Sequence, residues 1–214
     1  MYRSILTGKT LVALGDSLFY GNKLGNKATW INKLGKVCQM KVYNHGMNGN
    51  TLAAQNAETD KVPMCIRFAD MEDGADYVVV MGGANDKRLS VPIGDDDSRD
   101  IYTFKGALNV LIEGLTAKYP RAKILFMTTY QRWGGTNSAG HTEQDYADAM
   151  LAVCAKWAIP CFDNYRASGI CFANPAHLQW MDEGISLGMD KNCHFSKEAY
   201  DWLLPKYRAL LESL

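Results

Sequence analysis

Short apolar segments alternate with longer amphipathic segments along this chain. The short segments are rich in β-branched and aromatic residues and show little polar alternation, which is typical of strands buried on both faces of a parallel sheet. Five segments have this character, and they span residues 9–14, 40–44, 76–83, 122–130 and 159–163. The pattern therefore predicts a mostly parallel, five-stranded sheet.

The longer segments repeat their apolar residues at helical spacing, over residues 28–38, 103–119, 142–158 and 196–214. Thr142 and Asp145 predict a capping pair, Ser196 predicts an N-cap, and Pro205 predicts a kink or a break in the last helix. Strands that alternate with helices favour a three-layer α/β/α sandwich with right-handed crossovers, similar to flavodoxin. We see no repeat and no linker, so residues 1–214 are expected to form one domain.

Composition excludes several classes of partner. The 214 residues include 23 basic and 23 acidic side chains, so the chain lacks the positive charge expected of proteins that bind nucleic acid or anionic membranes. No apolar run approaches the length of a membrane span, and no signal-peptide core precedes the first strand. We expect a soluble protein without its own secretion signal. The sequence does not distinguish a cytoplasmic location from association with a virus particle.

Neither a metal nor a cofactor is expected. The six cysteines are scattered without a CxxC pair, which favours reduced thiols, and no Cys or His pair has the spacing of zinc ligands. The acidic stretch 94–100 lacks the ligand spacing of a calcium loop. The turn at 15–21 lacks the three glycines of a dinucleotide-binding loop, which argues against a nucleotide or flavin cofactor.

Four polar blocks stand at the ends of predicted elements: GDS (15–17), NHGMNGNT (44–51), GGAND (82–86) and DKNCHFS (190–196). The first three follow strands, and the carboxyl ends of parallel strands meet at one edge of the sheet. Taken alone, GDS is equally typical of a capped turn. Together, the blocks supply a hydroxyl, backbone N–H groups in a glycine turn, an amide and an imidazole. Acyl transfer needs these parts, because a base must activate the hydroxyl and donors must stabilise the oxyanion.

In this order the blocks resemble those of the SGNH hydrolases, also called the GDSL esterase and lipase family, over residues 15–194. The resemblance implies that Ser17 is the nucleophile and that His194 is the general base. It also implies an oxyanion hole formed by the N–H groups of Ser17 and Gly49 and the side-chain amide of Asn85. Asp16 would order the loop around the nucleophile without a catalytic role.

The acid of the catalytic triad is less clearly marked. The family usually places it three residues before the histidine, where this chain has Lys191. Asp190 lies four residues before His194, and one helical turn would bring the two to the same side. We expect Asp190 to orient the imidazole; Asp182 in that role, or a Ser–His dyad, stays open.

The resemblance implies a serine esterase that works through an acyl-enzyme. Polar and aromatic loops favour short-chain or acetyl esters as substrates, including esters on carbohydrates, so the expected partner is a small-molecule or polysaccharide ester. Trp133 and His45 are candidate substrate-binding residues, although a local hydrogen-bonding role for His45 stays open. Two alternatives remain: a lipase or thioesterase, and a non-catalytic carbohydrate-binding module that kept the fold. The sequence makes no prediction of oligomeric state.

Overall fold

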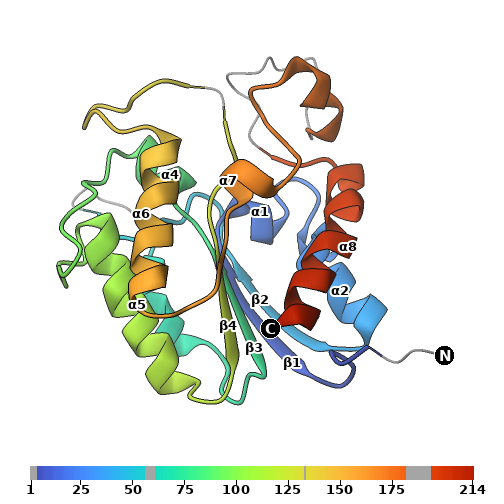
Figure 1. The fold of residues 1–214 in the computed structure, drawn as a ribbon. Helices are drawn as coiled ribbons and strands as arrows, with labels where there is room; N and C mark the ends of the chain where they lie inside the picture. The colour runs from blue at the N-terminus through green and yellow to red at the C-terminus, as the bar shows by residue number, and fades with distance from the viewer. Residues whose placement is uncertain (1–3, 56–60, 133, 182–193) are drawn as a thin grey trace.

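The computed structural model describes residues 4–55, 61–132, 134–181 and 194–214 and contains a five-stranded sheet (Figure 1). All neighbouring strands are parallel, and their order is β2-β1-β3-β4-β5. The strands are β1 (Thr10–Gly15), β2 (Lys41–Gly46), β3 (Tyr77–Met81), β4 (Lys123–Met127) and β5 (Cys161–Phe162). Each strand falls within or beside a predicted segment, so the predicted sheet is confirmed.

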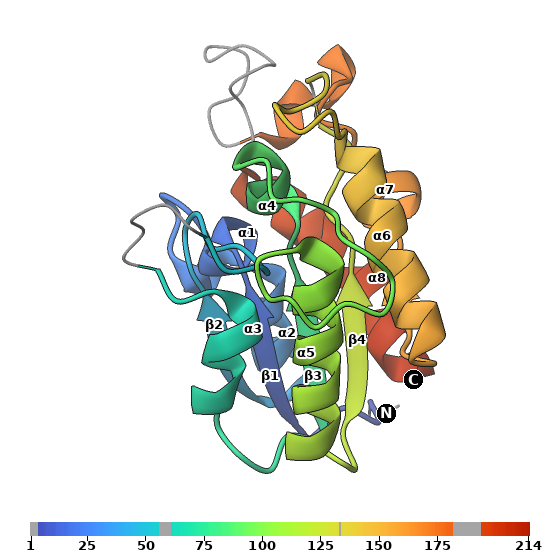
Figure 2. The ribbon, with the colours of Figure 1, turned by 90° about the vertical axis from the view of Figure 1, so that its left-hand side faces the viewer.

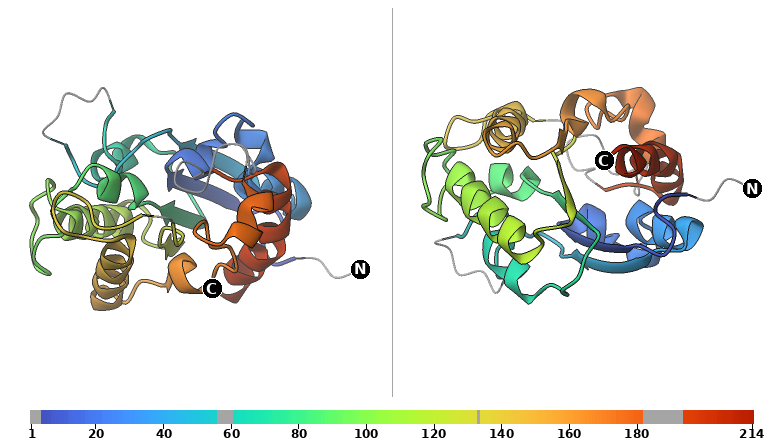
Figure 3. Two further views of the ribbon diagram at one scale, coloured as in Figure 1. Left: turned by 90° about the horizontal axis from the view of Figure 1, so that it is seen from above. Right: turned by 60° about the horizontal axis from the view of Figure 1, so that its bottom comes forward.

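Helices cover both faces of the sheet (Figures 1 and 3). One face packs against α2 (Trp30–Cys38) and α8 (Lys197–Ser213), and the other against α3 (Met64–Arg67), α5 (Phe104–Lys118) and α6 (Glu143–Lys156). Successive β1 side chains enter opposite cores, because strand side chains alternate between faces: Leu11 packs with α2 and α8, and Val12 with α5 and α6. The predicted three-layer sandwich is confirmed.

Short helices gather at the carboxyl edge of the sheet, which is the upper end in Figure 2. There α1 (Ser17–Tyr20) follows β1, α4 (Ala84–Arg88) follows β3, and α7 (Asn164–Ala167) follows β5. Three 3₁₀ helices complete the connections: η1 (Asn26–Ala28), η2 (Phe68–Asp70) and η3 (Pro175–Trp180). The first and third polar blocks thus open helices at one edge.

Two of the predicted helix caps are present, whereas the predicted break is absent. Thr142 and Asp145 form a reciprocal capping box on α6, and Ser196 Oγ accepts from Ala199 N–H at the start of α8. However, α8 continues through Pro205 to Ser213. Proline leaves the carbonyl one turn earlier without its donor, and here that carbonyl belongs to the exposed Asp201, where water can replace the bond.

Within the described residues, no helix combines the length and apolar character needed to cross a membrane. The five described cysteines, Cys38, Cys65, Cys154, Cys161 and Cys171, form no disulfide.

Candidate active site

Ser17 is the first residue of α1 and directly follows the end of β1. Asp16 caps this helix, since its Oδ1 accepts from Leu18 N–H at 2.9 Å. Gly21, at φ 75°, ends the helix after one turn, and its N–H bonds to the Ser17 carbonyl at 3.0 Å. The left-handed conformation favours glycine at that position. A cap and a tight turn therefore hold the serine at the carboxyl edge of the sheet.

The described structure brings Ser17 and His194 into direct contact. His194 Nε2 lies 2.9 Å from Ser17 Oγ, although the two residues are 177 positions apart. This is the distance at which an imidazole can take the proton of an attacking hydroxyl. The two residues predicted as nucleophile and base are therefore placed together.

Two aromatic residues, one just before α8 and one in its first turn, fix the start of this helix. Phe195, next to His194, is buried with ring centroids 4.8 Å from Tyr130 and 5.2 Å from Phe172. Tyr200 Oη donates to the carbonyl of Leu18 at 2.7 Å and so connects α8 to α1. The helix that follows the base is thus anchored to the helix that carries the nucleophile.

The second polar block forms a turn that lies against β1. Asn50 N–H bonds to the Met47 carbonyl at 3.2 Å, and Gly49 between them has φ 70°, again a conformation that favours glycine. Met47 N–H bonds to the Gly15 carbonyl at 3.0 Å and fixes the turn beside the serine. Within the described residues, neither Ser17 N–H nor Gly49 N–H has a hydrogen-bond acceptor. Neither donor is therefore committed to another described residue, as the predicted oxyanion role requires.

The start of the same block joins β2 to α1. Asn44 Nδ2 donates to the Phe19 carbonyl at 2.8 Å, and Asn44 Oδ1 accepts from Gly46 N–H at 2.9 Å. A Cβ on Gly46 would lie 2.2 Å from Tyr20 N, so only glycine allows this approach of the two backbones. The asparagine and glycine at the start of the block therefore hold the serine's helix in place.

Asn85 connects the third block to the second. It lies in α4 and donates one Nδ2 hydrogen to the Asn50 carbonyl at 3.0 Å, while its Oδ1 accepts from Arg88 Nε at 3.4 Å. A side-chain amide has two N–H groups, so the second stays available as a donor. This orientation suits the oxyanion role that the sequence predicts for Asn85.

Two buried carboxyls support the loops around the site. Asp86 is fully buried, and its oxygens accept from Leu52 N–H at 3.0 Å and Ala53 N–H at 2.9 Å. Burial raises the pKa of Asp86 to about 6, with the bonds from Ala53 and Leu52 opposing the shift. Burial also raises the pKa of Asp16, against the opposing positive charge of Arg132. Asp86 thereby ties α4 to the chain that follows the Gly49 turn.

Arg67 is a structural residue that the sequence analysis missed. Its Nη2 donates to the carbonyls of Gly15 at 2.9 Å and His45 at 2.7 Å, and its Nε donates to Asn50 Oδ1 at 2.8 Å. Burial lowers the pKa of Arg67 to about 10. One guanidinium therefore binds the ends of β1 and β2 and the turn that contains Gly49. No motif marks this arginine, because its partners are mostly backbone carbonyls.

Two asparagines that the sequence analysis did not single out lie behind the imidazole. Asn22 Nδ2 is 3.2 Å from His194 Nδ1, and Asn48 Nδ2 is 3.1 Å from Asn22 Oδ1. The sequence marks Asn22 only by its place just after Gly21. The tight turn at Gly21 returns the chain toward Ser17 and so brings Asn22 to the site.

Other candidates lie elsewhere or outside the described residues. His45 Nε2 is 2.6 Å from Glu72 Oε2, so its ring is paired with a carboxylate, and its contact with substrate stays a prediction. Trp133, Asp182 and Asp190 fall outside the described residues. Within the described part of the chain, no group of three His, Cys, Asp or Glu side chains is placed to hold a metal ion.

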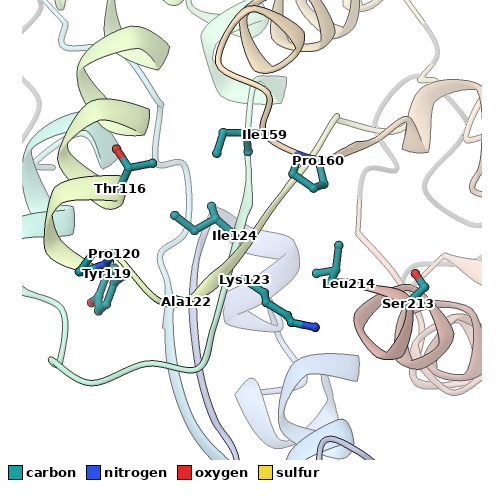
Figure 4. Close-up of a pocket in the computed structure, with 10 residues that line it drawn as sticks. All are labelled: Thr116, Tyr119, Pro120, Ala122, Lys123, Ile124, Ile159, Pro160, Ser213 and Leu214. Atoms are coloured by element: carbon teal, nitrogen blue, oxygen red, sulfur yellow. The ribbon is translucent and has the colours of Figure 1, made fainter.

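A pocket of about 470 Å³ lies at the opposite edge of the sheet (Figure 4). Its walls include Ile124, Ile159, Pro160 and Leu214, close to Lys123, where β4 begins. Ser17 instead follows the carboxyl end of β1. The pocket is therefore not part of the candidate active site.

Comparison with solved structures gives close overall matches. One protein is 32% identical with a TM-score of 0.87, over 98% of each chain. A protein from Lactobacillus plantarum is 26% identical with a TM-score of 0.83, over 97% of this chain and 98% of the other. An aryl esterase from M. smegmatis shares the fold at 16% identity and a TM-score of 0.68, over 97% of this chain and all of the other. No curated protein gave a match to the sequence.

The family model extends over nearly the whole chain. It matches residues 13–202, a range that begins in β1, contains all four polar blocks and ends within α8. The match includes both members of the Ser17–His194 contact. This chain belongs to the GDSL-like lipase/acylhydrolase family.

Proposed function

We propose that this protein is a serine esterase that hydrolyses carboxylic esters through an acyl-enzyme. Membership of an acylhydrolase family supports ester hydrolysis as the reaction class. The observation that carries the serine mechanism is the 2.9 Å contact between Ser17 Oγ and His194 Nε2. The N–H groups of Ser17 and Gly49, which have no acceptor among the residues that the structure describes, support it further, because they offer donors to a developing oxyanion.

In the acylation step, Ser17 Oγ attacks the ester carbonyl carbon while its proton moves to His194 Nε2. The carbonyl π electrons move to the oxygen, which the N–H groups of Ser17 and Gly49 and the amide of Asn85 stabilise. The tetrahedral intermediate then re-forms the carbonyl and breaks the bond to the alcohol oxygen. That oxygen takes the proton from His194 and leaves as a neutral alcohol.

Deacylation repeats these events with water as the nucleophile. His194 accepts a proton from water as the water oxygen attacks the acyl carbon. The second intermediate expels Ser17 Oγ, which regains a proton from His194 and releases the carboxylic acid. Base and nucleophile return to their starting protonation states, so one catalytic pair serves both halves of the reaction.

We assign short-chain or acetyl esters as the substrate class, with acetylated carbohydrates as a favoured example. Charged side chains border the turn that contains Gly49. Measured from the position that a Cβ on Gly49 would take, Lys61 Nζ lies at 2.9 Å and Arg88 Nη2 at 4.0 Å. Such a rim suits a polar substrate better than a long alkyl chain. Trp133 and His45 are predicted to contact the alcohol part.

The decisive experiment measures acetate release from p-nitrophenyl acetate by the native protein and by Ser17→Ala. We expect the variant to lose turnover and keep the native melting temperature. Ser213→Ala, at the far end of α8, is the matched control and should remain active. Undiminished turnover in Ser17→Ala would contradict the mechanism. Failure of the native protein both to turn over this ester and to react with a fluorophosphonate probe would favour a non-catalytic binding module.

A second experiment tests the substrate class. Rates are compared for p-nitrophenyl acetate, butyrate and octanoate, and then for acetylated sugars. We expect kcat/KM to be highest for acetate and to fall with chain length. Faster hydrolysis of octanoate would replace the proposal with a lipase-type acylhydrolase.

A further inference from the structure

We propose that the substrates of this protein are esters that carry a carboxylate, and that Lys61 and Arg88 bind this carboxylate beside the scissile carbonyl. The inference names a substrate class for the proposed esterase site and therefore rests on the proposed function. It starts from the space over Gly49, whose N–H group is a proposed oxyanion donor. A substrate held by that donor places its neighbouring groups in this space, within reach of the charges that border it.

Two positively charged groups converge on this space. From the position that a Cβ on Gly49 would take, Lys61 Nζ lies at 2.9 Å and Arg88 Nη2 at 4.0 Å. Apart from Gly49 and the residues on either side of it, no other described atom lies within 4 Å of that position. A carboxylate at this point can accept a charge-assisted hydrogen bond on each of its two oxygens, one from each cation.

Neither cation forms an ion pair with an acidic side chain among the residues that the structure describes, and both side chains are exposed. Arg88 donates from Nε to Asn85 Oδ1 at 3.4 Å, which leaves its Nη groups uncommitted within the described structure. The preceding residue, Lys87, is instead paired with Glu143 at 3.5 Å. The charges of Lys61 and Arg88 are therefore available to an anion from solution.

Arg67 adds a third positive charge beneath the same turn. Its guanidinium binds Asn50 Oδ1 and two backbone carbonyls, so its described partners are all uncharged. Asp86, in α4, is buried, and its carboxyl is bonded to two backbone N–H groups instead of to any of the three cations. Ion pairs among the described residues thus leave the positive charge around the turn in place, and this charge favours an anionic ligand.

The alternative role for these cations is stabilisation of the oxyanion itself. The two roles differ in the esters that they affect. Oxyanion stabilisation accelerates neutral and charged esters alike, whereas a carboxylate subsite accelerates only the esters that carry the carboxylate. The ratio of kcat/KM for a charged ester to kcat/KM for a matched neutral ester therefore measures the subsite alone.

The first test compares matched esters on the native protein. 4-Acetoxybenzoate and 4-acetoxybenzamide carry a carboxylate or a neutral amide on the alcohol part, and the mono-p-nitrophenyl esters of adipic acid and of its monoamide carry them on the acyl part. Each rate is divided by the rate of hydrolysis by hydroxide, which removes differences in intrinsic reactivity. We expect the charged ester to be favoured by about tenfold or more in at least one pair, and salt to weaken this preference.

The pair that shows the preference identifies the side of the ester that carries the carboxylate. A charged-to-neutral ratio near one in both pairs would overturn the proposal.

The second test asks whether Lys61 and Arg88 cause the preference. Lys61→Gln and Arg88→Gln should each lower the charged-to-neutral ratio by about threefold to tenfold, mainly through a higher KM for the charged ester. Lys61→Arg keeps the charge and should keep most of the preference. Lys123→Gln, the same kind of change at the opposite edge of the sheet, is the matched control and should keep the native ratio.

Melting temperatures show that each of these variants is folded. An unchanged ratio in either Lys61→Gln or Arg88→Gln would overturn the proposal. If charged and neutral esters lose the same share of their rate, the cations act on the oxyanion and not on a carboxylate.

The two proposals fail in different ways. If Ser17→Ala is inactive and the native protein shows no charge preference, the serine mechanism stands and the carboxylate subsite is wrong. If Ser17→Ala keeps full activity, the serine mechanism is wrong, and the same ester pairs still measure the subsite. If the native protein hydrolyses none of these esters, the esterase function is wrong, and calorimetric titration with 4-acetoxybenzoate and 4-acetoxybenzamide tests the subsite directly. Equal affinities for the two compounds would then overturn it.

Discussion

Asn85 Nδ2 lies 3.0 Å from the carbonyl oxygen of Asn50, so the amide that follows β3 is bonded to the turn that follows β2. The two loops that carry the proposed oxyanion donors are thereby held in one geometry before any substrate arrives. Such preorganisation is the basis of oxyanion stabilisation, because the donors need not reorganise as charge develops.

The Asn85 contact leads to a prediction for catalysis. Asn85→Ala should lower kcat by about a hundredfold or more, since one oxyanion donor is lost. Asn85→Asp should be worse, because a carboxylate would repel the oxyanion. Steady-state kinetics with p-nitrophenyl acetate measure both, with melting temperatures as the folding control. A loss of less than about tenfold would assign the stabilisation to the backbone N–H groups of Ser17 and Gly49.

The identity of the triad acid is tested by amide substitution. Asp190→Asn should lower kcat strongly, up to about 10⁴-fold, and leave the melting temperature unchanged, because the acid stabilises the imidazolium and not the fold. Asp182→Asn is the matched comparison and should have a small effect. The reverse ranking would transfer the role to Asp182, and small effects in both variants would indicate a Ser–His dyad.

Asp86 should make stability depend on pH. Its pKa is about 6 in the folded protein, against 3.8 for the free side chain, so the native state holds this proton more tightly than the unfolded state. The group's contribution to the free energy of unfolding is therefore complete below about pH 4 and is lost as pH rises through about 6. Relative to Asp86→Asn, which does not titrate, the native protein should lose about 3 kcal/mol over this range.

Urea unfolding of both proteins between about pH 4 and 8 measures the difference. Asp95→Asn, an exposed residue in a loop, is the control and should run parallel to the native protein. A constant difference between the native protein and Asp86→Asn would contradict the prediction.

Arg67 should be needed for both stability and activity. Arg67→Met removes a charged donor from the carbonyls of His45 and Gly15, of which Gly15 keeps its bond from Met47 N–H, and this should reduce the free energy of unfolding by about 2–4 kcal/mol. The rate should also fall, because the same guanidinium holds the Asn50 side chain, next to the proposed oxyanion donor Gly49. Thermal unfolding and kcat are compared with Arg121→Met, an exposed arginine that should have little effect. A native melting temperature in Arg67→Met would refute this role.

Much of the fold could be predicted from the sequence because its signals are local. Strand and helix periodicity depend on neighbouring residues, and so do the caps at Thr142 and Ser196, which the structure contains. Because the carboxyl ends of parallel strands meet at one edge of a sheet, three of the polar blocks could also be placed on that edge. The predicted break at Pro205 is absent for a tertiary reason, since packing of α8 on the sheet keeps the helix continuous despite one missing bond.

The sequence by itself determined the alternation of strands and helices, the order of the four blocks and the residue types that acyl transfer needs, because these are properties of the chain read in order. Only the tertiary structure decided that Arg67 connects the ends of β1 and β2 to the Asn50 side chain, that His45 pairs with Glu72 and that Asn22 faces the imidazole. Such contacts depend on where loops turn and how far side chains reach across a packed edge. No local pattern encodes these distances.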